Sequence, residues 1–557
     1  MFEKKLESIN KVVAGDSRKT ITSNAFINAA MKDNAKTLSG NGALKYSTTG
    51  NPFVDQFTDM GSYRKPRKYE DIVRDCELLW AEDEKLSVLF IYYIRTITRK
   101  VQLFNGYTTK EPQKGGQLKH EAIMRMIWLY HKNNDIFWNN IGLFISVGSW
   151  KDIFTMLQYD LMYHDWDGRV LNWDRFKNLI LNGLHDEQTC NLVKKYLPTI
   201  KSRTKTSTVA SQANNMIGKW IASFLFGNKQ SEQATYKMYR KLKGSGTAHE
   251  WQKLISQGKH DLIDFNTIHG RALSLLVKGK YLKNQGLEEK YAEWVKNPDQ
   301  KLKFTGFVHE LFSTLPRNHS SLPQHEADTI NKQFNTLVEK GGKKPRTKLI
   351  VVRDTSHSMS SPATGTKMSC YDLGKALALY FSEFLTGTFA DAWIEFNSDA
   401  KLHKWKGKTP IEKWYNDHSK YLGSTNFLSV VNLFARLHKE GVPESDFPTG
   451  ILCISDSEFN PSSLGITNVE EAKLILKTGG FSDEYVNNFV IVLWNLQNFY
   501  YGFNSGKKFE THGDTPNVFY FSGYEPSTIS FLDDKIKTPK ELFENAMNQE
   551  ILNMIRF

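Results

Sequence analysis

The sequence predicts a multidomain protein in which an all-helical N-terminal region precedes an α/β domain with a doubly wound sheet. The length of 557 residues is more than a single hydrophobic core usually organises. Between about residues 66 and 318, apolar residues recur at spacings of three and four, which is the helical period. From about residue 347, short apolar runs alternate with helical stretches, as in βαβ units. The expected division is a flexible leader at 1–50, a helical domain at 51–318, a linker at 319–346 and an α/β domain with a C-terminal helix at 347–557.

Periodicity separates the leader from the helical region. Residues 1–50 are rich in Ser, Thr, Asn, Lys and Gly without a sustained period, so we expect them to be mostly flexible, with a short helix near residues 25–31. The serial helical stretches that follow favour an α-solenoid of HEAT-like hairpins, either closed into a ring or left as an open arc. At one junction, Gly148 ends a helix, Ser149 caps the next helix and Asp152 occupies its N3 position. The polar segment 320–346 contains Gly-Gly-Lys-Lys-Pro and indicates a linker.

The C-terminal region is expected to alternate strands with helices. Its central strand is an unbroken apolar run that is rich in β-branched residues, which is typical of a strand buried on both faces. A turn at 397–399 should pair the second and third strands. The expected strands are 349–352, 390–396, 400–405, 451–454, 489–494 and 517–521. The expected helices are 371–385, 427–439, 469–478 and 539–555, the last of which opens with the capping box Thr538 to Glu541.

Positive charge is concentrated in one segment of the helical region. The chain has a net charge of +13, and residues 191–245 contain eleven basic residues and one acidic residue, which gives 11 − 1 = +10. Such a local excess favours a polyanionic partner such as RNA, although a solvated basic face is an equal alternative. Tyr236 and Tyr239 could stack on unpaired bases, but their spacing also suits an ordinary core. The candidate RNA-binding residues are Lys194, Lys195, Lys201, Arg203, Lys205, Arg240, Lys241 and Lys243.

A cluster of oxygen-bearing residues predicts a cation site in the C-terminal region. Asp354, Ser356 and Ser358 follow the central strand at a spacing of two, where open α/β sheets place their ligands. Thr425 precedes a helix and Asp456 ends a second buried strand, so both should reach the same edge of the sheet. Carboxylate and hydroxyl oxygens suit a hard cation such as Mg²⁺, or Mn²⁺. The alternative is a turn in which Asp and Ser cap the next helix.

The ordered set Asp-x-Ser-x-Ser, a later Thr and a later strand-terminal Asp resembles the metal-ion-dependent adhesion site of the von Willebrand factor A (vWA) family over residues 347–537. The resemblance implies that Asp354, Ser356, Ser358, Thr425 and Asp456 hold Mg²⁺ or Mn²⁺, partly through water, with one position open to a partner's carboxylate. Two departures are His357, where many relatives have glycine, and Arg353 directly before Asp354.

The whole chain resembles the Ro/TROVE ribonucleoproteins, and more closely an uncharacterised TROVE-like vWA family of plants, fungi and large phages. The shared features are a Gly-x-Trp-Lys-Asp helix junction in the N-terminal half and the strands containing 455–459, 492–496 and 521–523. In Ro proteins a helical ring binds single-stranded RNA ends and structured RNA. The resemblance implies RNA binding by residues 191–245 and a docking role for the metal site.

The expected function is therefore an RNA-binding, ribonucleoprotein-type protein with a metal-binding docking domain. The alternative is a protein–protein interaction, assembly or virion-associated module that binds an acidic partner through its metal site. We do not expect an enzyme, because the sequence contains no convincing catalytic triad, no Cys/His pair and no Gly-rich phosphate loop. Four separated cysteines, no secretory signal and no long apolar run indicate an intracellular, cytoplasmic protein with reduced thiols and no membrane span.

Overall fold

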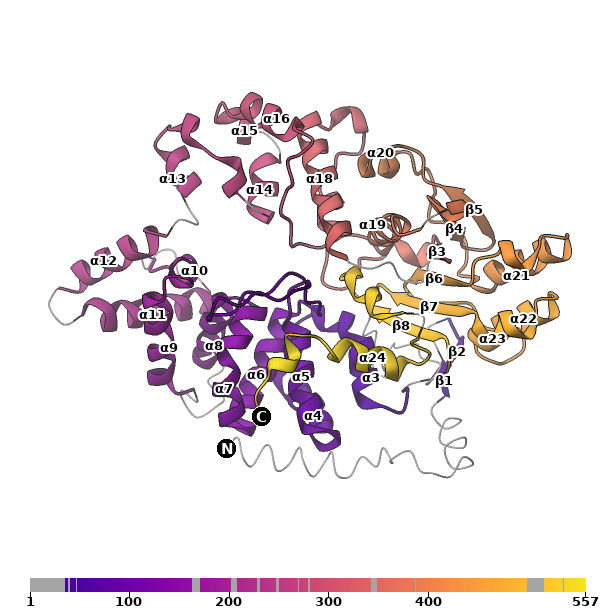
Figure 1. Cartoon of the computed structure of the whole chain (residues 1–557), viewed down its shortest axis with the longest axis horizontal. Coiled ribbons are helices and arrows are strands. Elements are labelled where there is room, and N and C mark those ends of the chain that lie inside the picture. Colours follow the sequence, from indigo (N-terminus) through magenta and orange to yellow (C-terminus); the bar gives the residue numbers. More distant parts are fainter. Residues whose placement is uncertain are drawn as a thin grey trace.

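The computed structural model shows a helix-rich N-terminal part followed by an α/β domain with a mixed six-stranded sheet (Figure 1). The expected two-part architecture is thus confirmed at this level. The structure describes residues 36–557 except 39–40, 47, 163–170, 202–207, 228–230, 247–249, 269, 279–280, 342–347, 386, 498–514 and 534. The helix expected near residues 25–31 lies outside the described residues.

The end of the expected leader is folded, which corrects the prediction of flexibility for that part. Strands β1 (Lys36–Leu38) and β2 (Leu44–Tyr46) form an antiparallel pair. The side-chain amide of Asn41, between them, donates to the carbonyl oxygen of Glu458 at 2.5 Å. A contact more than 400 residues away in sequence therefore orders this hairpin, and local composition could not have indicated it.

The N-terminal part is a succession of helices, and one of its connections, residues 96–118, is long. Capping side chains begin several of them: Asn51, Asp83, Asn133 and Thr208 each accept a hydrogen bond from the first turn that follows. The helices are α3 (Pro52–Thr58), the 3₁₀ helix η1 (Asp59–Arg64), α4 (Tyr69–Glu82), α5 (Glu84–Arg95), α6 (Lys119–Lys132), α7 (Asn134–Val147), α8 (Trp150–Met162), α9 (Trp173–His185), α10 (Cys190–Tyr196), α11 (Val209–Phe226), α12 (Glu232–Gly244), α13 (Glu250–Ser256), α14 (Gly270–Val277), α15 (Tyr281–Asn284), α16 (Glu288–Lys296) and α17 (Val308–Phe312).

The junction between α7 and α8 has the expected cap and an additional buried ion pair. Asp152, at the third position of α8, accepts the backbone N–H of Ser149 at 2.9 Å. Its carboxylate also pairs with the Arg95 guanidinium at 2.7 Å, and both side chains are buried. A Cβ at Gly148 would lie 2.3 Å from Asp152 Oδ2, so only glycine fits beside this ion pair.

Most of the segment expected as a linker is a helix, which corrects that prediction. Helix α18 (Gln324–Gly341) buries Ala327, Ile330 and Phe334 at spacings of three and four. It packs against α16, α17 and α20 (Pro410–Tyr415), so it belongs to the folded body rather than to a connection. The overall polarity of the segment reflects its solvent-facing side.

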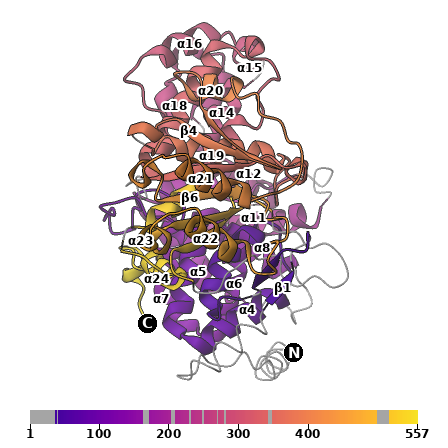
Figure 2. The same ribbon diagram turned by 90° about the vertical axis from the view of Figure 1, so that its right-hand side faces the viewer.

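The α/β domain contains strands in the order β5-β4-β3-β6-β7-β8, with β4–β5 antiparallel and the other neighbours parallel. Successive residues of β3 face opposite sides: Leu349 and Val351 pack in the core that contains α19, whereas Ile350 and Val352 pack in the core that contains α21 and α22. Helices therefore cover both faces of the sheet (Figures 1 and 2). The strands are β3 (Leu349–Asp354), β4 (Ala392–Phe396), β5 (Ala400–Lys404), β6 (Gly450–Ser455), β7 (Val490–Asn495) and β8 (Val518–Ser522). The remaining helices are α19 (Cys370–Ser382), α21 (Leu428–Lys439), α22 (Asn468–Thr478), α23 (Asp483–Asn488) and α24 (Pro539–Met547).

The last helix is shorter than the sequence predicted. Helix α24 opens with the expected capping box of Thr538 and Glu541 but ends at Met547, not near residue 555. The Gln549 side chain donates to the carbonyl of Lys114 at 2.9 Å and accepts the Lys114 N–H at 2.8 Å. The Asn140 side chain forms two more hydrogen bonds with the backbone of Arg556. Together these contacts hold the C-terminal residues against the helical part, so the helix does not continue to the end of the chain.

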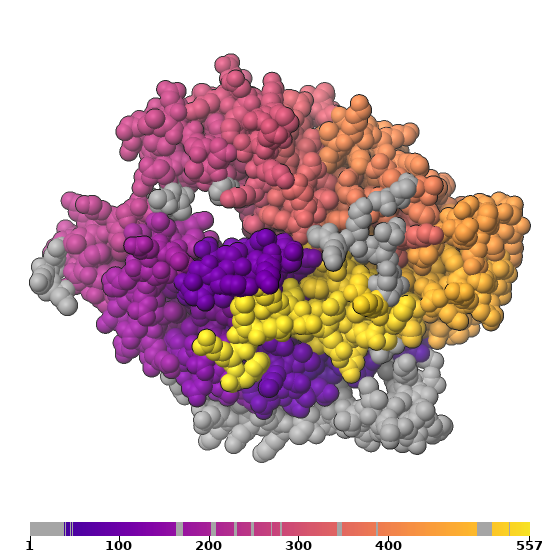
Figure 3. All heavy atoms as spheres, in the orientation of Figure 1, coloured from indigo at the N-terminus to yellow at the C-terminus, as the bar shows by residue number. Residues whose placement is uncertain are grey.

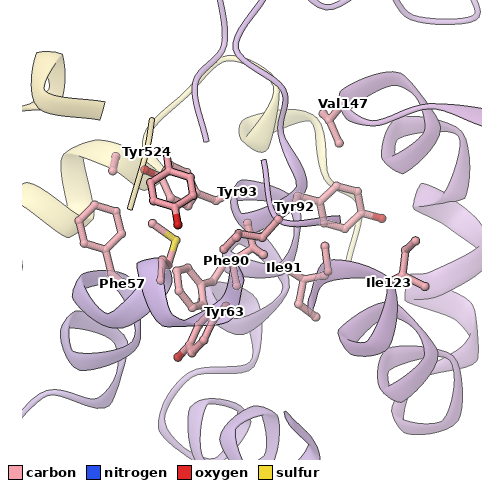
Figure 4. Close-up of a cluster of buried hydrophobic side chains, with 14 of the residues drawn as sticks. Phe57, Tyr63, Phe90, Ile91, Tyr92, Tyr93, Ile123, Val147 and Tyr524 are labelled. Carbon is pink, nitrogen blue, oxygen red and sulfur yellow. The ribbon is translucent and has the colours of Figure 1, made fainter. Parts of the chain in front are cut away.

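Both ends of the helical part pack against the α/β domain, so the chain closes on itself. At the beginning, α3 contacts β8 and α24, and η1 contacts β8. At the end, α17 contacts α19, and Phe334 of α18 packs against Tyr380 of α19. One hydrophobic core runs across the first junction, where Tyr524 packs near Phe57 and Tyr93 (Figure 4). The space-filling view shows an opening between the helices near α13 and α14 and the indigo segment beneath them (Figure 3).

Two further expectations concern the cysteines and the membrane. Among the described residues, Cys76, Cys190, Cys370 and Cys453 form no disulfide bond, which agrees with the expected reduced thiols. Within the described part of the chain, no helix has both the length and the apolar character needed to cross a membrane.

Candidate metal centre

Asp354 lies at the carboxyl end of the central strand and is completely buried. Its Oδ1 accepts the backbone N–H of Ser356 at 2.8 Å, and its Oδ2 accepts the hydroxyl of Ser455 at 2.5 Å. The hydroxyl oxygens of Ser356 and Ser358 lie 3.0 Å apart. The first three residues of the predicted site thus form one hydrogen-bonded group at the end of β3.

Asp456 follows directly after β6, the parallel neighbour of β3, and is also buried. The two carboxylates interact: burial and then the negative charge of Asp456 raise the pKa of Asp354 to about 7, although hydrogen bonds from Ser455 and Ser356 oppose the rise. The charges of Asp456 and Asp354 also add to the effect of burial in raising the pKa of the Cys370 thiol. Two acids therefore share a site that burial makes unfavourable for negative charge.

Thr425 is held at the same edge by backbone hydrogen bonds. The loop before α21 joins the Asp-x-Ser-x-Ser loop, because the N–H of His357 donates to the carbonyl of Gly423 at 3.3 Å and the N–H of Leu422 donates to that of Thr355 at 2.8 Å. Thr425 itself is buried, and its carbonyl accepts the N–H of Asn460 at 2.9 Å. The three chain segments that carry the five predicted residues are thus connected to one another.

Two residues that the sequence analysis did not single out help to build the site. Ser455 donates to Asp354 and its hydroxyl accepts the N–H of Ser457, which stands at a positive φ of 62°. The Asn460 side chain accepts the N–H of Thr425 at 3.3 Å. Ser455 could have been found as the last residue of its strand, beside the predicted acid, but nothing local identifies Asn460.

Arg353 points away from the carboxylates, because successive side chains of a strand face opposite sides. Its guanidinium pairs with Asp417 at 2.8 Å and lies over the rings of Tyr371 and Trp393, with carbon-to-centroid distances of 4.9 and 4.4 Å. The pair with Arg353 and Lys375 holds the pKa of Asp417 well below its usual range even though burial opposes this. His357, the other departure from the vWA pattern, is exposed and leaves the interior of the site to smaller side chains.

The donor set consists of two carboxylates and three hydroxyl groups. The described residues contain no cluster of three or more His, Cys, Asp or Glu side chains placed to hold a metal, so a site rich in nitrogen or sulfur ligands does not form in them. The oxygen set fits a hard cation, because Mg²⁺ uses few carboxylates and completes its octahedron with hydroxyl groups and water. A cation would also offset the repulsion between the Asp354 and Asp456 carboxylates.

The predicted RNA-binding residues lie on and between α10 and α12, which contact each other. Lys195, Lys201, Arg240 and Lys241 are exposed, and none forms an ion pair within the described part of the chain. Lys194 is half-buried, whereas Arg203 and Lys205 fall in 202–207, outside the described residues.

Two residues of this basic segment are structural. Tyr239 is completely buried and donates its hydroxyl to the carbonyl of Pro198 at 2.7 Å, so the core alternative is correct for this residue. The Lys243 ammonium donates to the carbonyl of Leu197, and burial lowers its pKa. Tyr236 is half-buried, with Lys219 over its ring at 5.5 Å.

The fold and the site together define a protein in which both ends of a helical part pack against an α/β domain that carries two buried acids at adjacent strand ends. Residues 348–554 match a family described only as a domain of unknown function, DUF7788. This match covers the α/β domain and the C-terminal segment. None of the curated proteins matches the chain.

Proposed function

We propose that this chain is an RNA-binding protein of the ribonucleoprotein type, with a vWA-type C-terminal domain that binds Mg²⁺ or Mn²⁺ and docks an acidic protein partner. One observation carries the proposal: Asp354 and Asp456 lie at the ends of the neighbouring parallel strands β3 and β6, and their carboxylates interact electrostatically. Numbered within the domain, the strand order is 3-2-1-4-5-6, and the crevice between strands 1 and 4 is where doubly wound sheets bind ligands.

The ion would be held by Asp354, Ser356, Ser358, Thr425 and Asp456. Bound there, the ion would have a coordination shell that the protein does not fill. One more anionic oxygen, supplied by a partner, would complete that shell. The exposed neighbours His357 and Ser360 leave the edge accessible to such a group. Thermal unfolding with and without Mg²⁺ tests this assignment most directly.

RNA binding is assigned to the basic face of α10 and α12, in a HEAT-like, TROVE-like helical part. Lys195, Lys201, Arg240 and Lys241 are exposed and not ion-paired with any acid of the described residues, which suits a phosphate backbone. The closure of the chain on itself supports a ring-type arrangement in which a single strand could follow the inner surface. Because Tyr239 is buried, affinity is expected to come from phosphate contacts more than from stacking on that ring.

Charge reversal tests the RNA assignment. Lys195→Glu, Arg240→Glu and Lys241→Glu together should weaken binding of a fluorescein-labelled single-stranded RNA 20-mer, and the slope of log K against log salt should fall by about 2, at about 0.7 per phosphate contact. Fluorescence anisotropy between 50 and 250 mM KCl measures both quantities. The control triple variant Lys401→Glu, Lys404→Glu and Lys406→Glu makes the same change in net charge on exposed residues of the α/β domain.

The control should retain most of the affinity and the salt slope. Equal losses in the two variants would mean that only net charge matters, which favours the alternative function: an interaction or assembly module that contacts nucleic acid nonspecifically. Unchanged affinity and slope in the first variant would remove α10 and α12 from the RNA-binding surface.

A further inference from the structure

A cavity of about 530 Å³ lies where the helical part meets the α/β domain. One wall comes from η1, α14 and α17 of the helical part. The other comes from residues 365–368, in the loop before α19, and from Tyr524, which follows β8. We propose that this cavity binds a small phosphorylated molecule of nucleotide size.

Three of the residues that line the cavity each have a buried polar atom with no hydrogen-bond partner among the described residues. These atoms are Nε of Arg64, Nδ1 of His309 and the hydroxyl of Tyr524. His309 is 5% exposed and Tyr524 is 3% exposed. Buried polar groups are nearly always hydrogen-bonded, because an unmade bond costs the desolvation of the group. The presence of three such residues around one cavity favours an occupant that carries several hydrogen-bonding oxygens.

The cavity also has an excess of positive charge. Arg64, Arg271 and Lys367 line it, and the acid among its lining residues, Glu310, is already paired with Arg271. Burial lowers the pKa of Arg64 to about 10, so its guanidinium still carries a charge at neutral pH. Burial and the charges of Arg64 and Arg271 lower the pKa of His309 to about 3, as expected next to an excess of cations. A dianionic phosphate fits this environment better than a neutral or monoanionic ligand.

Both walls of the cavity carry aromatic side chains, and the cavity is larger than a bare phosphate. The Arg64 guanidinium lies 4.3 Å from the centroid of Phe307 and 5.2 Å from that of Tyr524. The ring of His309 is nearly parallel to Phe307, with centroids 5.8 Å apart. Small-molecule pockets commonly measure about 300–1,000 Å³ and combine apolar walls with a few polar groups. The aromatic side suits a planar organic group attached to the phosphate.

An occupant would connect the two parts of the chain. Gly365 lies against Arg64, since a Cβ at Gly365 would come within 2.9 Å of the Arg64 Cβ. The loop that contains Gly365 begins after the 3₁₀ helix His357–Ser360, which belongs to the candidate metal centre. Ligand binding should therefore stabilise the junction and raise the melting temperature of the whole protein.

Calorimetric titration of the full chain with AMP, pyrophosphate and adenosine tests the proposal, with thermal unfolding as a second measurement. AMP and pyrophosphate should bind and raise the melting temperature, whereas adenosine, which lacks phosphate, should bind at least about tenfold more weakly. The double variant Arg271→Gln and Lys367→Gln should weaken AMP binding at least about tenfold. The control Arg74→Gln and Lys540→Gln removes two similarly exposed cations elsewhere and should leave it unchanged.

Absence of binding by AMP and pyrophosphate at millimolar concentration would mean a water-filled cavity and would overturn the proposal. If AMP binding weakened equally in the control variant, AMP would be held only by nonspecific electrostatic attraction, and the proposed site would be refuted. Binding of a 5′-phosphorylated RNA 10-mer without binding of AMP or pyrophosphate would replace the small ligand by an RNA end. Lys367→Gln alone, on an exposed loop, repeats the test if the double variant does not fold.

Discussion

Removal of Asp417 should destabilise the α/β domain strongly, because it leaves a buried guanidinium without its partner. The side chains of Arg353 and Asp417 are 0% and 3% exposed, and their nearest charged atoms are 2.8 Å apart. Asp417 also accepts the N–H of Ser419 at 3.1 Å and lies 3.4 Å from the Lys375 ammonium. Loss of one member of such a buried pair costs about 3–5 kcal/mol, compared with about 0–1 kcal/mol for an exposed pair.

The assay is urea unfolding of Asp417→Ala, with Asp483→Ala as the matched control. Asp483 pairs with Lys477 at 2.9 Å, but the two side chains are 75% and 62% exposed. We expect the free energy of unfolding to fall by about 3–5 kcal/mol in the first variant and by at most about 1 kcal/mol in the control. A loss in Asp417→Ala no larger than that of the control would refute the role assigned to this pair.

The dependence on pH provides a second test of the same pair. Because the folded-state pKa of Asp417 lies below its unfolded value, the carboxylate contributes stability above the unfolded pKa of about 4, and this contribution is lost as the pH falls toward the folded pKa. The difference between wild type and Asp417→Ala should therefore be the same at pH 7 and pH 5 and smaller at pH 3. A difference that grows on acidification would contradict the sign of this argument.

Two further predictions concern the packing of the helical part. Gly148→Ala should lower the free energy of unfolding by about 2–4 kcal/mol, because the new Cβ would displace the buried ion pair of Asp152 and Arg95. The control is Gly244→Ala, where a new Cβ meets nothing within 4 Å. Equal urea midpoints for the two variants would contradict the argument. Asn140→Ala should release the last residues of the chain, because the Asn140 side chain forms hydrogen bonds with both the N–H and the carbonyl of Arg556. Hydrogen exchange at residues 549–557 should therefore accelerate. Unchanged protection there would mean that the other contacts are enough to keep these residues in place.

The α/β domain was largely predictable because its signals are local. Its central strand is a short β-branched run, and Asp354 and Asp456 each follow a short apolar run after one intervening residue. Parallel strands that are neighbours in a sheet bring their carboxyl ends together, so the meeting of the two acids followed from topology. The positions of Ser358 and Thr425 relative to them depend on loop contacts, such as His357 with Gly423, that the sequence did not indicate.

The errors occurred where distant contacts outweigh local composition. Helix α18 was expected as a linker because its average polarity hid the buried stripe of Ala327, Ile330 and Phe334. Residues 549–556 continue the helical pattern of α24, but hydrogen bonds to Lys114 and Asn140, more than 400 positions earlier, give them another conformation. The basic segment was recognisable from its charge alone. Charge did not reveal, however, that the Lys243 ammonium donates a hydrogen bond to the Leu197 carbonyl or that Tyr239 belongs to the core.

The most direct test of the central claim is thermal unfolding of wild type and Asp354→Asn at pH 8, in EDTA and in up to 10 mM Mg²⁺ or Mn²⁺. Because the pKa of Asp354 is raised, metal-free wild type should lose stability as the pH rises from about 4 to about 7, and Asp354→Asn should be at least as stable as wild type in EDTA. A metal concentration ten times the Kd should stabilise wild type by about 1.4 kcal/mol and leave the variant unaffected. A wild type that does not respond to either ion, or a variant that responds equally, would contradict a cation site at Asp354 and Asp456.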